Sequence, residues 1–178
     1  MKVCILAAPH SQYADLFPDD TVVYTFAEDA DLVVFTGGED IGTNKVRDAY
    51  EELVFTISHS LGVPMLGICR GAQFLHVMNG GRLHQHVEGH LGGHVIHTRD
   101  GKKVPVTSTH HQMMDLENAE EHKLLAWASI VGDTDPEVVY YRNTNSLCVQ
   151  FHPEIAPGGS PCRMYFNRIL RNFLEDTL

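Results

Sequence analysis

Short apolar runs alternate with polar segments from the first residues of the chain. Three of these runs, at residues 2–7, 21–26 and 31–36, are continuous rather than alternating in polarity. Continuous runs bounded by Pro, Gly and Asp are typical of strands that are covered on both faces in a parallel sheet. We therefore expect three buried strands, the first of them ended by Pro9.

A helix is predicted to begin at Thr43 or Asn44 and to end near Leu61, where Gly62 and Pro64 stop it. Apolar residues recur through this segment at steps of three and four, which is the spacing of one helix face. That face, which we expect to be buried, consists of Val46, Tyr50, Leu53, Ile57 and Leu61.

A fourth strand is predicted at residues 65–68, and a second helix runs to about Met78, where Gly80 and Gly81 close it. The order strand, helix, strand, helix indicates an open α/β sheet with right-handed crossovers.

Two hairpins are predicted in the second half of the chain. Residues 95–98 and 103–107 flank Asp100-Gly101, and residues 138–142 and 146–151 flank a polar turn at 143–145. We expect a short helix at residues 120–129 and a terminal helix from Pro161. Apolar residues available for burial in the terminal helix are Met164, Phe166, Ile169, Leu170 and Phe173. The chain, residues 1–178, is thus expected to form a single three-layer α/β domain with antiparallel hairpin additions.

Composition narrows the class of protein. The chain is 43% hydrophobic, and 13 Lys and Arg against 23 Asp and Glu give a formal charge of −10, which argues against a nucleic-acid partner. No apolar run approaches the roughly 20 residues of a membrane helix, and the N-terminus lacks the form of a signal peptide. Four widely spaced cysteines fit reduced thiols. We expect a cytoplasmic protein without a membrane partner.

Cys69 lies at the junction between the fourth strand and the second helix, with Gly67 and Gly71 on either side. Gly-x-Cys-x-Gly in this context is the thiol version of a nucleophile elbow, in which a sharp turn exposes one side chain at the strand end. The helix N-terminus would aim backbone N–H groups at the space above the sulfur. The alternative is a buried structural cysteine in a tight turn, because free cysteine is commonly a core residue.

A nucleophilic cysteine needs a histidine to accept and return its proton. The chain has 12 histidines, and His152 differs from the others because it follows a strongly apolar strand. Glu154 lies two residues further on, beyond Pro153, close enough to orient the imidazole. On spacing alone, an incidental surface His and Glu remain the alternative.

Six sequence blocks, at residues 35–41, 47–51, 64–73, 80–85, 109–112 and 149–154, carry a family resemblance in consistent order. Together they resemble the class I (triad-type) glutamine amidotransferase superfamily, and most of all its gamma-glutamyl hydrolase branch, which includes gamma-glutamyl-gamma-aminobutyrate hydrolases. The resemblance implies a mostly parallel, flavodoxin-like central sheet. It also implies a catalytic triad with Cys69 as nucleophile, His152 as general base and acid, and Glu154 as the orienting carboxylate.

The resemblance assigns further roles around the thiol. It places an oxyanion hole at the backbone N–H groups of Gly37, Gly38 and Arg70, which fits the close backbone approach that glycine allows. It also implies substrate contacts from Gln73, His111 and Gln112. No cofactor is implied.

The resemblance favours hydrolysis of a gamma-glutamyl amide, in glutamine or a small conjugate, through a gamma-glutamyl thioester. The alternative is the glutaminase subunit of a two-protein amidotransferase that supplies ammonia to a separate synthetase, because the chain is short for a stand-alone hydrolase. A non-catalytic binding or metal module on the same fold is the third hypothesis. The small-molecule substrate is the expected partner, with a synthetase subunit and a homodimer left open.

Histidines are dense between residues 84 and 97, and histidine is the commonest zinc ligand. The members of this group are His84, His86, His90, His94 and His97. No thiol or carboxylate falls at a repeated ligand spacing among them, so the sequence predicts no metal site.

Overall fold

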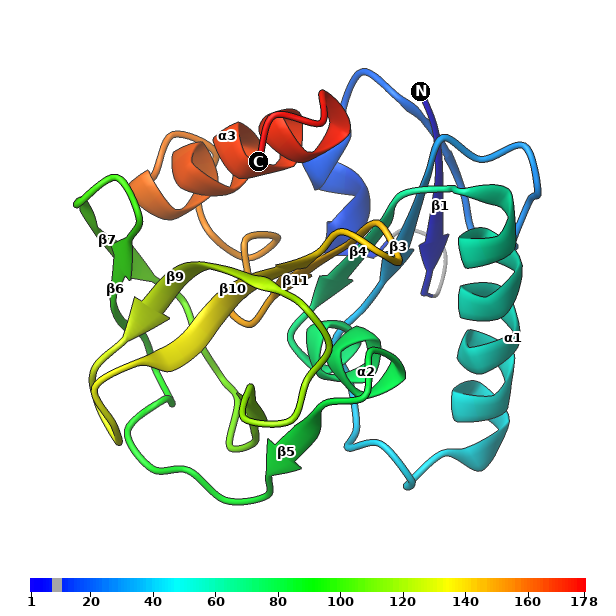
Figure 1. Cartoon of the computed structure of the whole chain (residues 1–178). Coiled ribbons are helices and arrows are strands. Elements are labelled where there is room, and N and C mark those ends of the chain that lie inside the picture. Colours follow the sequence, from blue (N-terminus) through cyan, green and yellow to red (C-terminus); the bar gives the residue numbers. More distant parts are fainter. Residues whose placement is uncertain (8–10) are drawn as a thin grey trace.

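The computed structural model describes residues 1–7 and 11–178 as an α/β fold around a twisted sheet of nine strands (Figure 1). Across the sheet the strand order is β2-β1-β3-β4-β11-β10-β9-β6-β7. The strands are β1 (Lys2–Leu6), β2 (Thr21–Val23), β3 (Leu32–Phe35), β4 (Met65–Ile68), β6 (His94–Thr98), β7 (Lys103–Val106), β9 (Lys123–Ala128), β10 (Asp135–Tyr141) and β11 (Ser146–Val149).

The sheet has a parallel half and an antiparallel half. Strands β2, β1, β3, β4 and β11 run parallel, and β10, β9, β6 and β7 continue the sheet with antiparallel pairing. The four N-terminal strands and both hairpins are confirmed. Pro9, the predicted end of the first strand, lies outside the described residues.

Helices cover both faces of the sheet. Helices α1 (Lys45–Leu61) and α2 (Arg70–Met78) pack on one face, and α3 (Pro161–Leu174) covers the other together with the 3-10 helix η1 (Gln12–Leu16) (Figure 1). Each face has its own apolar cluster, because the central strands are buried on both sides. This confirms the expected three-layer architecture.

Helix α1 has the predicted ends but not the predicted buried face. Asn44 caps it by accepting a hydrogen bond from the Arg47 N–H at 3.1 Å, and Gly62 ends it with a φ of 71°. The expected apolar face is largely turned outward, with Val46 83% and Leu53 57% exposed. The helix instead buries Glu51, Val54, Phe55 and Ser58. The prediction was wrong because an ion-pair network, described below, draws the acidic side of the helix inward.

The terminal helix is confirmed, and one residue on it differs from expectation. Ser160 caps the helix and Pro161 opens it. Four of the five expected residues are buried against the sheet, whereas Met164 is exposed.

The helix predicted at residues 120–129 is wrong, since this segment forms β9. The composition of its apolar run is compatible with a helix or a strand. The segment forms a strand because it pairs with β10 on one side and β6 on the other. A separate two-stranded sheet joins β5 (Arg82–His84) to β8 (Met113–Asp115).

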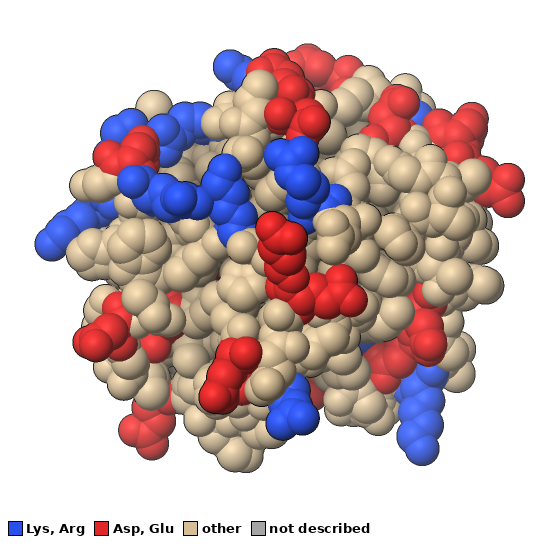
Figure 2. Space-filling model, in the orientation of Figure 1, with Lys and Arg blue, Asp and Glu red and all other residues tan. Residues whose placement is uncertain are grey.

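Charges are unevenly spread over the face in Figure 2. Lys and Arg side chains gather over α3 and the β6–β7 hairpin, and acidic side chains are mostly scattered elsewhere. The basic group is partly neutralised within itself, because Asp100 lies 2.7 Å from Arg168 and 3.0 Å from Lys102. Among the helices described, none is long and apolar enough to cross a bilayer.

Candidate active site

The end of β4 turns sharply into α2 at Cys69, which has a φ of 52° and a ψ of −110°. A non-glycine residue in this conformation is strained, and such strain is typical of a nucleophile elbow. The flanking glycines make the turn possible. A Cβ on Gly67 would lie 2.5 Å from the Gly71 carbonyl oxygen, and one on Gly71 would collide with the Phe35 carbonyl oxygen. The sharp turn is therefore the one that the sequence predicts, but the Cys69 side chain is buried, with 8% of its surface exposed, rather than standing exposed.

Cys69 opens into a pocket of about 410 Å³ between the elbow and two loops. Most of the predicted site residues line this pocket: Gly38, Cys69, Arg70, Gln73, His111, Gln112 and His152. The structure thus brings together residues that lie more than 100 positions apart in the chain.

His152 follows β11 and is held from both ring nitrogens. Its Nδ1 lies 2.6 Å from Glu154 Oε1, and its Nε2 lies 2.8 Å from Thr109 Oγ1. Arg163 on α3 fixes this loop from behind, donating from Nε to the Pro153 carbonyl at 2.9 Å. Glu154 is buried and lies behind the imidazole, which is the arrangement expected of an orienting carboxylate.

The electrostatics around His152 favour the imidazolium. Burial alone lowers the pKa of His152, but the interactions with the neighbouring Cys69 and Glu154 outweigh burial and raise the pKa to about 10. An imidazolium beside a cysteine stabilises the thiolate, which is the nucleophilic form of the side chain.

The two predicted oxyanion glycines lie differently. The Gly37 N–H donates to Tyr13 Oη at 2.9 Å, so it is directed away from the pocket. Burial raises the pKa of Tyr13, which keeps this hydroxyl protonated. Gly38, with a φ of 148°, lines the pocket. Of the two glycines, Gly38 is the one that lines the pocket together with Arg70 at the start of α2.

A buried ion-pair network fixes these loops. Arg70 pairs with Asp48 and with Glu51 of α1, and Arg47 Nε lies 2.8 Å from Glu51 Oε1. The same Arg47 side chain donates to the carbonyls of Thr36 at 2.9 Å and Gly37 at 3.1 Å. Sequence block 47–51 of the family resemblance therefore links the glycine loop to the elbow.

The predicted substrate residues are tied to one another. Gln73 Nε2 donates to the Gln112 carbonyl at 3.0 Å, and Gln112 Nε2 donates to Gln85 Oε1 at 2.7 Å. At the mouth of the pocket, His111 Nε2 lies 3.1 Å from Asp40 Oδ2.

Sequence reasoning did not single out Tyr13, Thr109 or Arg163. Thr109 belongs to a family block and could have been found there, whereas Tyr13 and Arg163 have no local signal. Their roles depend on tertiary contacts with segments far away in the chain.

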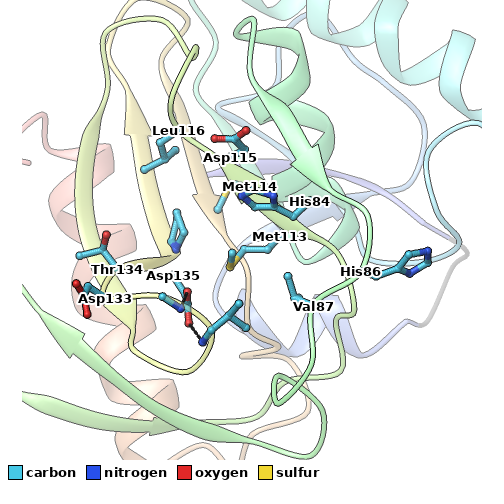
Figure 3. Close-up of a pocket in the computed structure, with 13 residues that line it drawn as sticks. His84, His86, Val87, Met113, Met114, Asp115, Leu116, Asp133, Thr134 and Asp135 are labelled. Atoms are coloured by element: carbon cyan, nitrogen blue, oxygen red, sulfur yellow. Dashed lines mark hydrogen bonds between the residues drawn. The ribbon is translucent and has the colours of Figure 1, made fainter.

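A second pocket of about 440 Å³ lies apart from Cys69, between the β5–β8 sheet and the 131–136 loop (Figure 3). His84 and His86 line it, together with Met113, Met114 and Asp135. It contains no residue of the predicted triad, so its size does not make it the reaction site.

Comparison with known proteins identifies the family. The family model of glutamine amidotransferase class-I matches residues 12–172. The arginine-specific small chain of carbamoyl phosphate synthase from Bacillus subtilis is 33% identical over 113 residues, which are 62% of this chain and 32% of that protein. The carbamoyl phosphate synthase small chain of Methanopyrus kandleri is 31% identical over 146 residues, 80% of this chain and 39% of that protein. The chain thus spans about a third of the length of these relatives.

A solved structure supports the fold independently. A glutamine amidotransferase from Thermotoga maritima superposes with a TM-score of 0.70 at 16% identity, covering 98% of this chain and 84% of that one. Since the family model matches most of the sequence and the fold agrees, this chain belongs to the class-I glutamine amidotransferase family.

Proposed function

We propose that this chain, residues 1–178, is a glutaminase domain that releases ammonia from glutamine for a separate synthetase chain. The relatives that are small chains of carbamoyl phosphate synthase support this function over the free-standing gamma-glutamyl hydrolase that the sequence motifs placed first. The observation that carries the proposal is the convergence of Cys69 and His152 on one pocket, with Glu154 2.6 Å behind the imidazole.

In the proposed reaction the Cys69 thiolate attacks the side-chain carbonyl carbon of glutamine. The N–H groups of Gly38 and Arg70 stabilise the resulting oxyanion. His152 donates a proton to the leaving nitrogen, so that ammonia departs and a gamma-glutamyl thioester remains on Cys69. His152 then takes a proton from water, hydroxide adds to the thioester, and glutamate leaves as the thiolate is restored.

The proposed substrate contacts follow the pocket lining. Gln73 and Gln112 present amide groups to the amino-acid end of the substrate, and His111 and Asp40 border the entrance. Polar groups held by mutual hydrogen bonds are preorganised, which reduces the entropy lost on binding.

The second candidate is hydrolysis of a gamma-glutamyl amine without a partner. It is favoured by the six family blocks, which are most similar to the gamma-glutamyl hydrolase branch. The two candidates share the nucleophile and the thioester, and they differ in the group that leaves.

The test is a rate measurement on the purified chain with glutamine and with a panel of gamma-glutamyl amines. Cys69→Ala should abolish release of ammonia or amine, whereas Cys4→Ala, at a buried thiol outside the pocket, should retain it. Slow turnover of glutamine with no turnover of the amines supports the ammonia-supplying function. A higher kcat/KM for a gamma-glutamyl amine supports the hydrolase. Full activity in Cys69→Ala would contradict both.

A further inference from the structure

Four side chains outside the proposed catalytic set converge on one point between the loop at residues 107–112 and β10. Their ligand atoms all lie within 4.8 Å of one another. The members of this histidine–glutamate cluster are His90, His94, His110 and Glu137. They come from three separate segments: His90 and His94 from the loop before β6 and the first residue of that strand, His110 from the loop at residues 107–112, and Glu137 from β10.

Glu137 Oε1 is the centre of the cluster. It lies 2.7 Å from His94 Nε2, 3.3 Å from His90 Nδ1 and 3.5 Å from His110 Nε2. A tetrahedral zinc site with bonds of about 2.0–2.1 Å has edges of about 3.3–3.4 Å between ligand atoms. Two of the three Glu137 separations match these edges, and the third needs only a small adjustment. The remaining edges, among the three histidine nitrogens, lie within 4.8 Å and would shorten around the ion.

The cluster is buried and short of hydrogen bonds. His90 and Glu137 are 0% exposed and His110 is 3% exposed. Within the part of the chain that the structure describes, neither ring nitrogen of His90 has a hydrogen-bond partner, nor do His110 Nε2 and Glu137 Oε2. Burying polar atoms without partners is costly, and a bound cation would supply the missing partner to several of them at once.

Neighbouring groups orient the imidazoles for a cation. The His110 Nδ1–H donates to the Gln112 carbonyl at 2.9 Å, which leaves the lone pair of Nε2 directed at the cluster. Asp135 Oδ2 lies 3.4 Å from His90 Nε2, on the side of the ring away from Glu137.

Asp135 is itself fixed. Its carboxylate accepts hydrogen bonds of 2.8 Å from the N–H groups of Ile130, Val131 and Gly132, within the loop drawn in Figure 3. A carboxylate beside the far nitrogen of a ligating histidine is a common support of zinc sites, and Asp135 lies in that position at 3.4 Å without forming a hydrogen bond to His90.

We propose that the histidine–glutamate cluster is a zinc site. Three imidazole nitrogens and one carboxylate oxygen are ligands that zinc accepts, and four protein ligands close its tetrahedral shell. A closed shell leaves no position for a substrate, so the site is structural. It links residues 90–94 and the loop at residues 107–112 to β10.

The site adjoins the catalytic pocket through His110. This residue lies between Thr109, which contacts His152, and Gln112, which accepts a hydrogen bond from Gln73. Zinc would therefore fix the loop that carries these two residues. This last consequence rests on the proposed glutaminase function, whereas the metal site itself does not.

The sequence predicted no metal because the stretch from His84 to His97 lacks a suitably spaced carboxylate. Only His90 and His94 of that stretch belong to the cluster, and the other two ligands are His110 and Glu137. The other histidines of the stretch do not belong to the cluster.

The test uses the full chain after chelation and dialysis, reloaded with zinc chloride or cobalt chloride. We expect one zinc per chain by mass spectrometry of the metal, visible absorption bands of tetrahedral cobalt, and an increase in Tm on zinc addition. Glu137→Gln and His90→Ala should weaken zinc binding by at least about 100-fold. His84→Ala, at an exposed histidine outside the cluster, should bind as the wild type does.

Several outcomes would overturn the proposal. Wild-type protein that retains no zinc, or that gives octahedral cobalt spectra, has no such site and holds the cluster as a hydrogen-bonded network. Equal zinc affinity in Glu137→Gln and wild type also rules it out. If a variant fails to fold by circular dichroism, the wild-type stoichiometry and cobalt spectrum decide. None of these measurements depends on glutamine turnover.

Discussion

Glu51 on α1 and Arg70 at the start of α2 form an ion pair in which both side chains are buried, with 1% and 2% of their surfaces exposed. Through Arg47, which pairs with Glu51 and donates to the carbonyl of Gly37, the same network reaches the glycine loop. Glu51 therefore links the two segments that carry the proposed oxyanion donors, Gly38 and Arg70, while Asp48 provides a second carboxylate for Arg70.

Glu51→Gln should damage both stability and catalysis. Loss of the Glu51 charge leaves Arg47 without this carboxylate and Arg70 with Asp48 alone, and we expect the free energy of unfolding to fall by about 3 kcal/mol. Displacement of the oxyanion donors should lower kcat by roughly 100-fold with little change in KM. Urea unfolding and steady-state kinetics measure the two effects. Glu52→Gln, at the exposed neighbouring residue, is the control, and equal behaviour of the two variants would contradict the role given to Glu51.

The strained backbone at Cys69 predicts an unusual order of stability. Cys69→Gly should be more stable than Cys69→Ala by about 1 kcal/mol, because only glycine adopts a φ of 52° with a ψ of −110° without strain. Both variants lack the thiol and should be inactive. Thermal or urea unfolding of the pair measures the difference, and a more stable Cys69→Ala would show that the turn is not strained.

Much of the fold is predictable from the sequence, because buried parallel strands have a distinct pattern. The runs that form β1, β3 and β4 are apolar except for Lys2 and lie between proline, glycine or polar residues, so their place in the interior of the sheet follows from composition. The sequence of the segment that forms β9 does not distinguish a strand from a helix. Only its neighbours in the sheet make it a strand rather than a helix.

The buried face of α1 shows where the pattern misleads. Its apolar residues at three- and four-residue steps are the exposed ones, and Glu51 faces the interior instead. A charged residue is buried there because Arg70 and Arg47 neutralise it, and no local pattern reveals such partners. A site can thus override the hydrophobic pattern of the element that supports it.

The candidate site also has residues that the sequence reveals and residues that only the structure reveals. Cys69 belongs to one local motif, and His152 and Glu154 belong to another. All three residues could therefore be predicted from the sequence. The Tyr13 hydroxyl oxygen accepts a hydrogen bond from the Gly37 N–H, and Glu137 supplies the carboxylate of the histidine–glutamate cluster. Each acts on residues that lie more than 20 positions away, which only the folded chain brings near.

Glu154→Gln tests the orienting carboxylate. An amide cannot stabilise the imidazolium of His152, so we expect kcat for glutamine hydrolysis to fall by roughly 10²–10⁴-fold. Alkylation of Cys69 by iodoacetamide at pH 7 should also slow, because less thiolate is present. Glu175→Gln, at the end of α3, serves as the control. Unchanged alkylation in Glu154→Gln would remove the argument for a Cys69–His152–Glu154 unit.

The raised pKa of His152 predicts how stability depends on pH. The folded-state pKa is about 10 and the ordinary value is 6.5, so folding favours the protonated ring. This contribution is fully present below pH 6.5 and is lost as pH rises toward 10. It amounts to a few kcal/mol, because a pKa difference of one corresponds to about 1.4 kcal/mol.

His152→Gln should therefore destabilise the protein at pH 6 and much less at pH 10. Urea unfolding of wild type and variant at pH 6, 8 and 10 measures the change, with His84→Gln, at an exposed histidine outside the site, as the control variant. The wild-type curve should decline across the interval while the His152→Gln curve stays flatter. A constant difference between them at all three pH values would mean that His152 is not held as an imidazolium beside Cys69 and Glu154.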